Sequence, residues 1–217
     1  MKKIHLLPSA FAVAILLAVL PACTTTGGQP GKYTVKAFKP KDPSKVVVKV
    51  STSTQNIYVK EGNRLLMAVQ GCVGDMGRTP LGSFRIFNKL KTKRSGSYGF
   101  TSSGGPAEAD KGQNVAVGYP MAFWCEFAPA YGFHEGFVWS VPRTHGCIRM
   151  HKEAAARFFQ LVKVGTPVSI AKTQPEDAEY GHFVRKLDQR NEPNPPTKLL
   201  MSPSWFTDPA GTLLIEE

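Results

Sequence analysis

The sequence lacks an apolar run long enough to cross a bilayer. Its longest run, AFAVAILLAVL at residues 10–20, has eleven residues, whereas a helix needs about twenty to span a hydrocarbon core of about 30 Å. A transmembrane anchor is therefore the least favoured role for this segment. A short apolar run that follows a positive start, here MKK, is instead typical of a signal peptide. We expect residues 1–22 to be one.

The residues that end this apolar segment, LPAC (Leu20–Cys23), resemble the lipobox of bacterial lipoproteins. The resemblance implies that Cys23 is acylated and becomes the mature N-terminus, so that its lipid anchors the protein to a membrane. The alternative is an ordinary cleaved signal peptide that leaves Cys23 free. In both cases we expect an exported protein that faces the periplasm and cell wall.

Acidic residues are few. The chain has 16 Asp and Glu against 27 Lys and Arg, a formal net charge of +11 that falls to +9 when Lys2 and Lys3 leave with the predicted signal peptide. A basic exported domain suits an anionic surface, such as phospholipid headgroups or the carboxylates of a cell-wall polymer. Nucleic acid is not expected as a partner, because no Lys/Arg-rich block or basic motif interleaved with aromatic residues is present.

Cysteine is also scarce, with only Cys23, Cys72, Cys125 and Cys147 in the chain. The sequence contains neither a CxxC nor an HExxH pattern, which would indicate a metal site. In an exported protein Cys72 and Cys125 could form a disulfide. They could equally be two buried thiols, because a free cysteine packs like a small hydrophobic residue. The sequence leaves both alternatives open.

Most of the chain carries strand signals rather than helix signals. Segments rich in β-branched residues alternate in hydrophobicity, and EGN at residues 61–63 predicts a hairpin turn. The order of elements predicts a mainly β fold, a β-sandwich or barrel-like sheet with one core helix. Strands are predicted at residues 45–53, 55–60, 64–72, 83–90, 121–128, 131–136 and 166–171.

The remaining segments divide the chain. Residues 23–45, rich in Gly, Pro, Thr and Lys, predict a flexible tether, and the domain itself is expected at 46–171. Within it, the Gly-, Ser- and Lys-rich residues 91–118 predict an irregular insert, either a lid or a disordered loop. The apolar spacing after His151 predicts a helix that Gly165 ends. Residues 172–217 form a Pro-rich C-terminal extension, whose apolar residues are expected to pack back on the domain.

One stretch carries the chemistry: SVPRTHGCIRM (Ser140–Met150). A thiol is nucleophilic only as thiolate, and a nearby imidazole lowers its pKa. His134 lies thirteen residues before Cys147, so a loop between them could return imidazole to sulfur. The base needs a third group to orient its ring, for which Thr144 or a backbone carbonyl of the loop is available. Glu135 would point away from His134 on an extended segment.

The residues around Cys147 suit acyl chemistry. Gly146 lets the chain turn sharply and expose backbone N–H groups, so the N–H groups of His145, Gly146 and Cys147 could form an oxyanion hole. A helix that begins near His151 would favour a thiolate at its N-terminus. Arg149 offers a bidentate clamp for a substrate carboxylate, and we also expect Tyr131 to contribute to substrate binding.

A metal site and a purely structural thiol also fit these residues. His134, His145, Cys147 and His151 are all potential zinc ligands, although neighbouring strand positions alternate faces and His145 and Cys147 would have to bend to share a metal. A cysteine near a histidine can also be merely structural. The residues alone favour a nucleophile but leave the metal site and the structural thiol open.

Several motifs in one order resemble a known family. THGCIRM with His134 upstream in YGFHEG resembles the signature of the L,D-transpeptidase (YkuD-type) catalytic domain. TPLGSFRI (Thr79–Ile86), QNIYVKEGNRLLMAVQG and GTPVSI resemble other elements of that domain. The likeness runs from about Val46 to Ala171. Glu135 departs from the pattern, because Gly or Ser more often follows the base, and Cys72 stands where a small or polar residue is more common.

The resemblance implies a β-sandwich-like fold and acyl transfer on peptidoglycan stem peptides, without a cofactor or a metal. Cys147 would attack the carbonyl of the diamino acid in a tetrapeptide stem and release D-alanine. The thioester would pass to an amine of a second stem or of a protein. By position, His134 would be the general base, Thr144 would support the histidines, and Arg149 would hold the catalytic loop or a substrate carboxylate. Transfer to water (an L,D-carboxypeptidase) and a non-catalytic wall-binding module are the alternatives.

Overall fold

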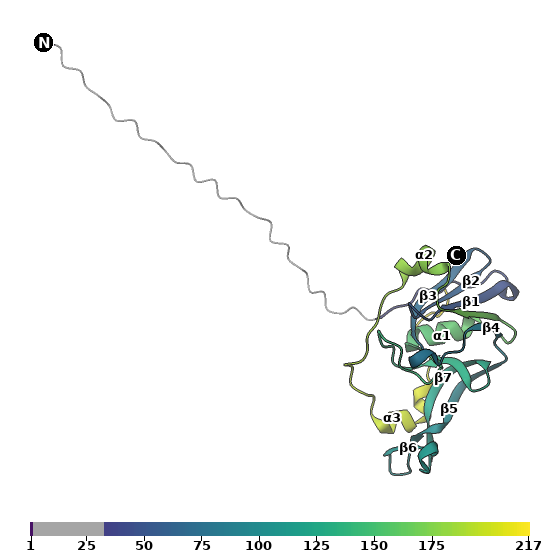
Figure 1. The fold of residues 1–217 in the computed structure, drawn as a ribbon, viewed down its shortest axis with the longest axis vertical. Coiled ribbons are helices and arrows are strands. Elements are labelled where there is room, and N and C mark those ends of the chain that lie inside the picture. The colour runs from purple at the N-terminus through teal and green to yellow at the C-terminus, as the bar shows by residue number, and fades with distance from the viewer. Residues whose placement is uncertain (2–32) are drawn as a thin grey trace. The chain divides into compact units, whose positions relative to one another are not determined.

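The computed structural model describes Met1 and residues 33–217, and residues 33–217 form one compact unit. Ten strands make a single mixed sheet in the order β4-β10-β1-β2-β3-β9-β8-β7-β5-β6 (Figure 1). The prediction of a mainly β fold is thereby confirmed. The strands are β1 (Val46–Ser51), β2 (Asn56–Glu61), β3 (Arg64–Cys72), β4 (Gly82–Arg85), β5 (Asn88–Phe100), β6 (Pro106–Glu108), β7 (Val117–Ala128), β8 (Tyr131–Glu135), β9 (Ile148–Met150) and β10 (Pro167–Ala171).

Helices are few and short in the described part of the chain. None of those among residues 33–217 has the length and apolar character needed to cross a membrane. The α-helices are α1 (Lys152–Leu161), α2 (Glu176–Tyr180) and α3 (Thr197–Met201), and the 3₁₀ turns are η1 (Pro43–Lys45), η2 (Asp75–Gly77), η3 (Ala109–Lys111), η4 (Gly181–Phe183) and η5 (Pro203–Phe206).

The sheet curls so that its two halves face each other. Strand β3 belongs to both halves: it pairs with β2 on one side and with β9 on the other. All pairs are antiparallel except β1 with β10 and β8 with β9. Phe84 of β4 and Phe127 of β7, from opposite halves, meet with their ring centroids 5.5 Å apart. The core thus lies between two layers, as a sandwich requires.

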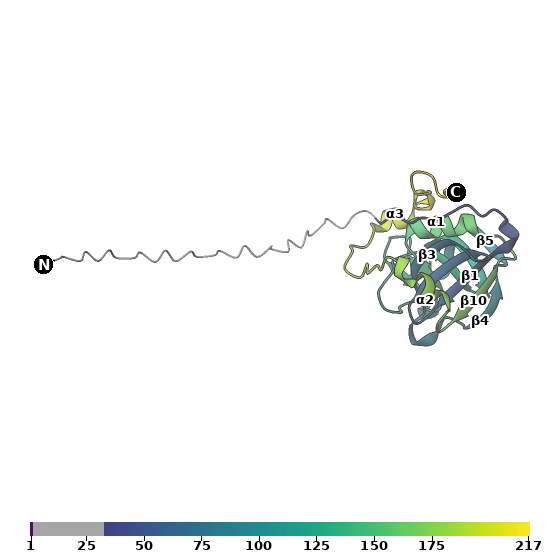
Figure 2. The same ribbon diagram turned by 90° about the horizontal axis from the view of Figure 1, so that it is seen from above.

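Helix α1 packs against β7, β8 and β9, and Figures 1 and 2 show it lying against the sheet. The His151 side chain accepts a hydrogen bond from the Glu153 N–H and so caps the helix. Phe158, fully buried, packs on Phe133 of β8 with ring centroids 4.6 Å apart. The helix ends at Leu161, four residues before Gly165, because Val162 has an extended backbone and the Lys163 N–H bonds the Thr166 hydroxyl.

The predicted irregular insert at residues 91–118 is wrong. Most of it is the hairpin formed by β5, β6 and β7. Two of its glycines allow backbones to approach closely: a Cβ at Gly99 would lie 2.2 Å from the Val117 carbonyl oxygen, and one at Gly118 would lie 2.0 Å from that of Ser95. The predicted strand at 83–90 is also divided, because β4 pairs with β10 and β5 with β7.

The predicted tether is too long. Residues 33–45 pack on the domain: Ala37 is buried, and Phe38 forms a bridge with Ile215 near the C-terminus. Tyr33 meets the His151 ring edge-on, with centroids 4.6 Å apart. Cys23 and the predicted signal peptide, apart from Met1, lie outside the described residues. Of the two alternatives for Cys72 and Cys125, the structure has the buried free thiols.

The C-terminal extension packs back on the domain. Arg94 of β5 donates hydrogen bonds to the carbonyl oxygens of Leu200, Met201 and Ser202, at 2.9–3.1 Å. Its guanidinium carbon lies 4.9 Å from the Phe206 ring centroid. Figure 1 shows α3 beside the end of the sheet that carries β6. One arginine of the hairpin therefore anchors three consecutive carbonyls of the extension.

We predict that Arg94→Met lowers the free energy of unfolding by about 2–3 kcal/mol, because hydrogen bonds from a charged group are worth about 1.5–3 kcal/mol. The matched control is Lys91→Met, which removes an exposed ion pair to Asp208 and should cost less than about 1 kcal/mol. Urea unfolding followed by tryptophan fluorescence measures both. Equal, small losses would contradict the anchoring role of Arg94.

Candidate active site

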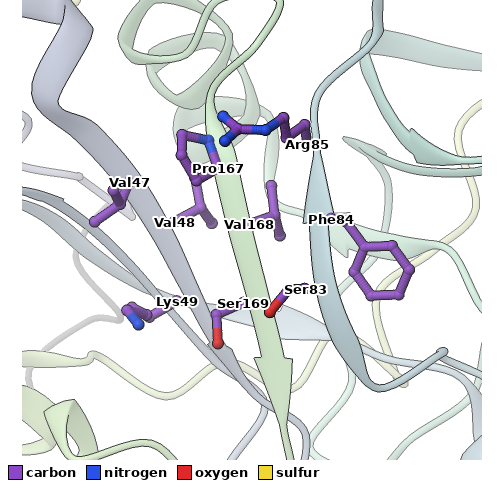
Figure 3. Close-up of a pocket in the computed structure, with 9 residues that line it drawn as sticks. All are labelled: Val47, Val48, Lys49, Ser83, Phe84, Arg85, Pro167, Val168 and Ser169. Atoms are coloured by element: carbon purple, nitrogen blue, oxygen red, sulfur yellow. The ribbon is translucent and has the colours of Figure 1, made fainter.

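Six of the predicted site residues line one cleft. It has a volume of about 660 Å³ and lies beside the junction of β7, β8 and β9. A second cavity of about 530 Å³ lies over β1, β10 and β4 (Figure 3), and its lining holds no cysteine, histidine or carboxylate. Of these two cavities, only the first is lined by cysteine and histidine. The six residues are Tyr131, His134, Thr144, His145, Cys147 and Arg149.

The parallel pairing of β8 with β9 brings His134 and Cys147 to one side of the sheet. Phe133 is opposite Ile148, and His134 is opposite Arg149. Since neighbouring strand residues point to opposite faces, the buried Phe133 and Ile148 enter the core, whereas His134 and Arg149 share the cleft face. Cys147, two residues before Arg149, faces the same way. His134 and Cys147, thirteen residues apart in the sequence, thus lie on or next to adjacent strands.

His134 is a neutral base in this environment. Its ring is buried, and Nδ1 lies 2.7 Å from the carbonyl oxygen of Glu135. Because a carbonyl only accepts, Nδ1 carries the hydrogen and Nε2 keeps its lone pair. Burial, with help from the Arg149 charge, lowers the pKa of His134 to about 4. The third group of the site is thus a backbone carbonyl, that of Glu135.

Cys147 rests as a thiol. Its Sγ lies 3.7 Å from the Ala130 carbonyl oxygen, in the orientation of a donor. Burial, and to a smaller extent the Glu126 carboxylate, raise the pKa of Cys147 above its ordinary value. The Gly132 N–H and the Arg149 charge lower this pKa but do not reverse the shift. With a neutral imidazole across the cleft, the resting pair is thiol and imidazole rather than thiolate and imidazolium.

The loop before Cys147 is held by the hydroxyl of Thr144. This oxygen accepts from the Gly146 N–H at 3.0 Å and donates to the Cys147 carbonyl at 2.5 Å. Thr144 therefore holds the backbone, where we expected it to support the histidines. The Gly146 N–H is also occupied, contrary to its expected place in the oxyanion hole. Within residues 33–217, the N–H groups of His145 and Cys147 have no acceptor and remain for that role.

Gly146 is required for a different reason. It has φ +126°, and a Cβ there would lie 2.2 Å from the Tyr131 ring carbon Cε1 and 2.9 Å from the Arg78 carbonyl oxygen. A side chain at this position would meet both backbone strain and a clash. Tyr131, expected to bind substrate, thus also packs against the loop that carries the nucleophile.

The family is settled by the sequence as a whole. A model of the L,D-transpeptidase catalytic domain (YkuD) matches residues 45–170. The chain belongs to this family. No curated protein matches the sequence.

Solved L,D-transpeptidases are similar over part of the chain. The protein from Stackebrandtia nassauensis is 19% identical, with a TM-score of 0.46, and the match covers 64% of this chain and 60% of that one. L,D-transpeptidase 1 of Mycobacterium tuberculosis is 22% identical, with a TM-score of 0.43, and 58% and 61% are covered. An L,D-transpeptidase from Mycobacterium smegmatis is 17% identical, with a TM-score of 0.47 and 58% of each chain covered. The chain spans about 60% of the length of these structures.

In this family member, two cations of the cleft have no acidic partner. No Asp or Glu carboxylate in the described part of the chain lies within 4.0 Å of the Lys93 ammonium or the Arg149 guanidinium. The predicted alternative of a zinc site finds no cluster: residues 33–217 hold no group of three or more His, Cys, Asp and Glu side chains placed to bind a metal ion.

Other cleft residues were missed at the level of sequence. Tyr98 stacks on His145 with ring centroids 5.0 Å apart, but it lies in the segment that we expected to be an irregular insert. Asn194, from the C-terminal extension, also lines the cleft. Nearby, Gln189 exchanges two hydrogen bonds of 2.9 Å with the backbone of Val138, so the extension holds the loop that leads to Cys147. No sequence motif marks Asn194 or Gln189.

Alkylation of Cys147 by iodoacetamide should accelerate steadily from pH 6 to pH 9. The thiolate fraction falls as pH drops below the raised pKa of the thiol, and a neutral His134 supplies no ion pair that would keep thiolate at low pH. Mass spectrometry of the Cys147 peptide measures the rate, and His134→Gln should leave the shape of the profile unchanged. A rate plateau reaching down to pH 5 that disappears in His134→Gln would contradict the neutral pair.

Proposed function

We propose that the protein is a cysteine L,D-transpeptidase that acts on peptidoglycan stem peptides. The observation that carries this proposal is the common cleft face of Cys147, His134 and Arg149, fixed by the β8–β9 pairing. The family supplies the reaction class, and the geometry supplies a nucleophile, a base with a free lone pair and two backbone donors.

In the proposed reaction, His134 Nε2 removes the proton of Cys147 as sulfur attacks the carbonyl of the diamino acid in a tetrapeptide stem. The N–H groups of Cys147 and His145 stabilise the oxyanion of the tetrahedral intermediate. As the C–N bond breaks, the imidazolium returns its proton to the amine of D-alanine, which leaves. The product of this half-reaction is a thioester between Cys147 and the shortened stem.

The second half-reaction runs in reverse order. The amine of a second stem or of a protein attacks the thioester and loses a proton to His134, which then protonates the leaving sulfur. The product is an amide, a 3–3 crosslink or a protein attached to the wall. No metal or cofactor is required, because the base, the nucleophile and the donors are all supplied by the chain.

Charge in the cleft supports a peptide substrate with free carboxylates. Lys93 and Arg149 supply two cations without acidic partners. The cleft also contains one carboxylate, that of Glu126. The terminal carboxylate of a stem peptide and the carboxyl groups along it would meet the cations. The aromatic rings of Tyr98, Tyr119 and Trp124 supply apolar walls for the remainder of the peptide.

The decisive variant is Cys147→Ala, which should abolish D-alanine release and the thioester adduct with a tetrapeptide muropeptide. Cys72→Ala, which removes a buried thiol outside the cleft lining, should retain turnover and is the matched control. Product analysis by mass spectrometry separates 3–3 crosslinks and protein adducts from tripeptides. Turnover in Cys147→Ala would contradict the mechanism, and tripeptides as the only product would assign an L,D-carboxypeptidase.

We further propose that Cys23 is lipidated and anchors an exported protein to a membrane facing the cell wall. The support is the leader sequence alone: a positive start, an eleven-residue apolar run and LPAC. Metabolic labelling with a palmitate analogue should mark the wild-type protein, and Cys23→Ala should lose the label. An unlabelled wild type, or a label that survives in Cys23→Ala, would overturn this proposal.

A further inference from the structure

A buried threonine outside the cleft reaches the peptide bond before the nucleophile. Thr79, three residues before β4, is only 2% exposed. Its hydroxyl accepts a hydrogen bond from the Gly74 N–H at 2.8 Å and donates one to the Gly146 carbonyl oxygen at 2.9 Å. Thr79 does not line the cleft, so the Gly146 carbonyl is directed away from the substrate.

This contact fixes the direction of the Cys147 N–H. In a planar trans peptide, the carbonyl of one residue and the N–H of the next point in opposite directions. When the Gly146 carbonyl is held on Thr79, the Cys147 N–H must point away from Thr79, to the side of the cleft. The N–H that we assign to the oxyanion hole is thus aimed by a hydroxyl on the far side of its own peptide.

The opposite orientation is a real alternative for this peptide. Gly146 has no Cβ, and rotation about its ψ together with φ of Cys147 would exchange the carbonyl and the N–H. A flipped peptide would present a carbonyl oxygen to the developing oxyanion, which it would repel. Thr144 does not prevent the flip, because it bonds the Gly146 N–H and the Cys147 carbonyl, which belong to the two neighbouring peptides.

The Gly74 N–H determines the direction in which the hydroxyl hydrogen of Thr79 points. Because this N–H already donates to the hydroxyl oxygen, the hydroxyl hydrogen points elsewhere and needs an acceptor. The Gly146 carbonyl is that acceptor, and a flipped peptide would leave a buried hydroxyl hydrogen without one. Gly74 also cannot carry a side chain, since its Cβ would lie 2.7 Å from the Thr79 nitrogen and 2.9 Å from the Gly146 Cα.

We propose that Thr79 is a positioning residue of the acyl transfer, which holds the Gly146–Cys147 peptide with its N–H turned to the oxyanion. This inference rests on the proposed function, because only a reaction with a tetrahedral oxyanion requires that donor. Removal of one oxyanion donor typically slows a reaction about 10²–10³-fold. Loss of its orientation, with the donor still present, should cost about 10- to 100-fold in the acylation step.

The test compares two reactions of the same sulfur in the full chain. Acylation of Cys147 by a carbapenem passes through a tetrahedral oxyanion, whereas alkylation by iodoacetamide is a displacement at a saturated carbon and forms none. In Thr79→Val, which keeps the size and loses the hydroxyl, the acylation rate should fall about 10- to 100-fold, and alkylation should stay within about twofold. Thr79→Ser, which keeps the hydroxyl, should retain the wild-type ratio of the acylation rate to the alkylation rate.

Thr166→Val is the matched control. Thr166 is also a 2% exposed threonine, and its hydroxyl accepts a backbone hydrogen bond, from the Lys163 N–H, outside the cleft lining. It should leave the ratio at the wild-type value. If Thr79→Val does not fold, Thr79→Cys, whose thiol is a much weaker donor than a hydroxyl, should still lower the ratio of acylation to alkylation, and only the Cys147 peptide is quantified by mass spectrometry. A ratio below wild type supports the proposal.

An unchanged ratio in Thr79→Val, or an equal fall in its acylation and alkylation rates, would overturn the proposal. A wild-type protein that reacts with iodoacetamide but not with the carbapenem would instead contradict the proposed acyl-transfer function. A wild type that reacts with both, with an unchanged ratio in Thr79→Val, would overturn only the role of Thr79.

Discussion

The parallel pairing of β8 with β9 is the constraint on which the site depends. One register, with His134 opposite Arg149, places both of these residues and Cys147 on the cleft face and sends Phe133 and Ile148 into the core. A slip of one residue would exchange the two faces. The apolar contacts under the strands, such as Phe133 with Phe158 of α1, therefore also specify the chemistry above them.

Burial sets the protonation states of the groups around this pair. His134 is kept neutral and Cys147 is kept as a thiol, so neither charge has to be stabilised before the substrate arrives. The Glu135 side chain follows the same rule: burial raises its pKa to about 7, although Lys152 lowers it, and Oε2 has no partner within residues 33–217. Glu135 therefore orients His134 through its backbone carbonyl, while its carboxyl group belongs to the core side of the sheet.

The parts of the site that could be predicted are those that lie close together in sequence. THGCIRM and His134 led to the expectation that Cys147 and His134 share a site, because they lie close together in sequence, and the structure places both in one cleft. The strands within 91–118 were missed because the segment is rich in glycine, and composition does not show that Gly99 and Gly118 permit close backbone approach. The occupied Gly146 N–H and the role of Thr79 depend on hydrogen bonds that form only when distant segments meet. The position of Asn194 in the cleft depends on how the C-terminal extension packs.

The described thiols differ in their susceptibility to oxidation, which proceeds through the thiolate and requires access. Cys125 is fully buried with its pKa raised to about 12, and Cys72 is buried as well. Cys147 alone among these three is partly exposed. A backbone N–H and a cation favour its ionised form, but backbone N–H groups and arginines do the same for the buried Cys72, so access is what separates the two. Peroxide is therefore expected to reach the cleft first, so that oxidative stress removes the chemistry while the sheet stays folded.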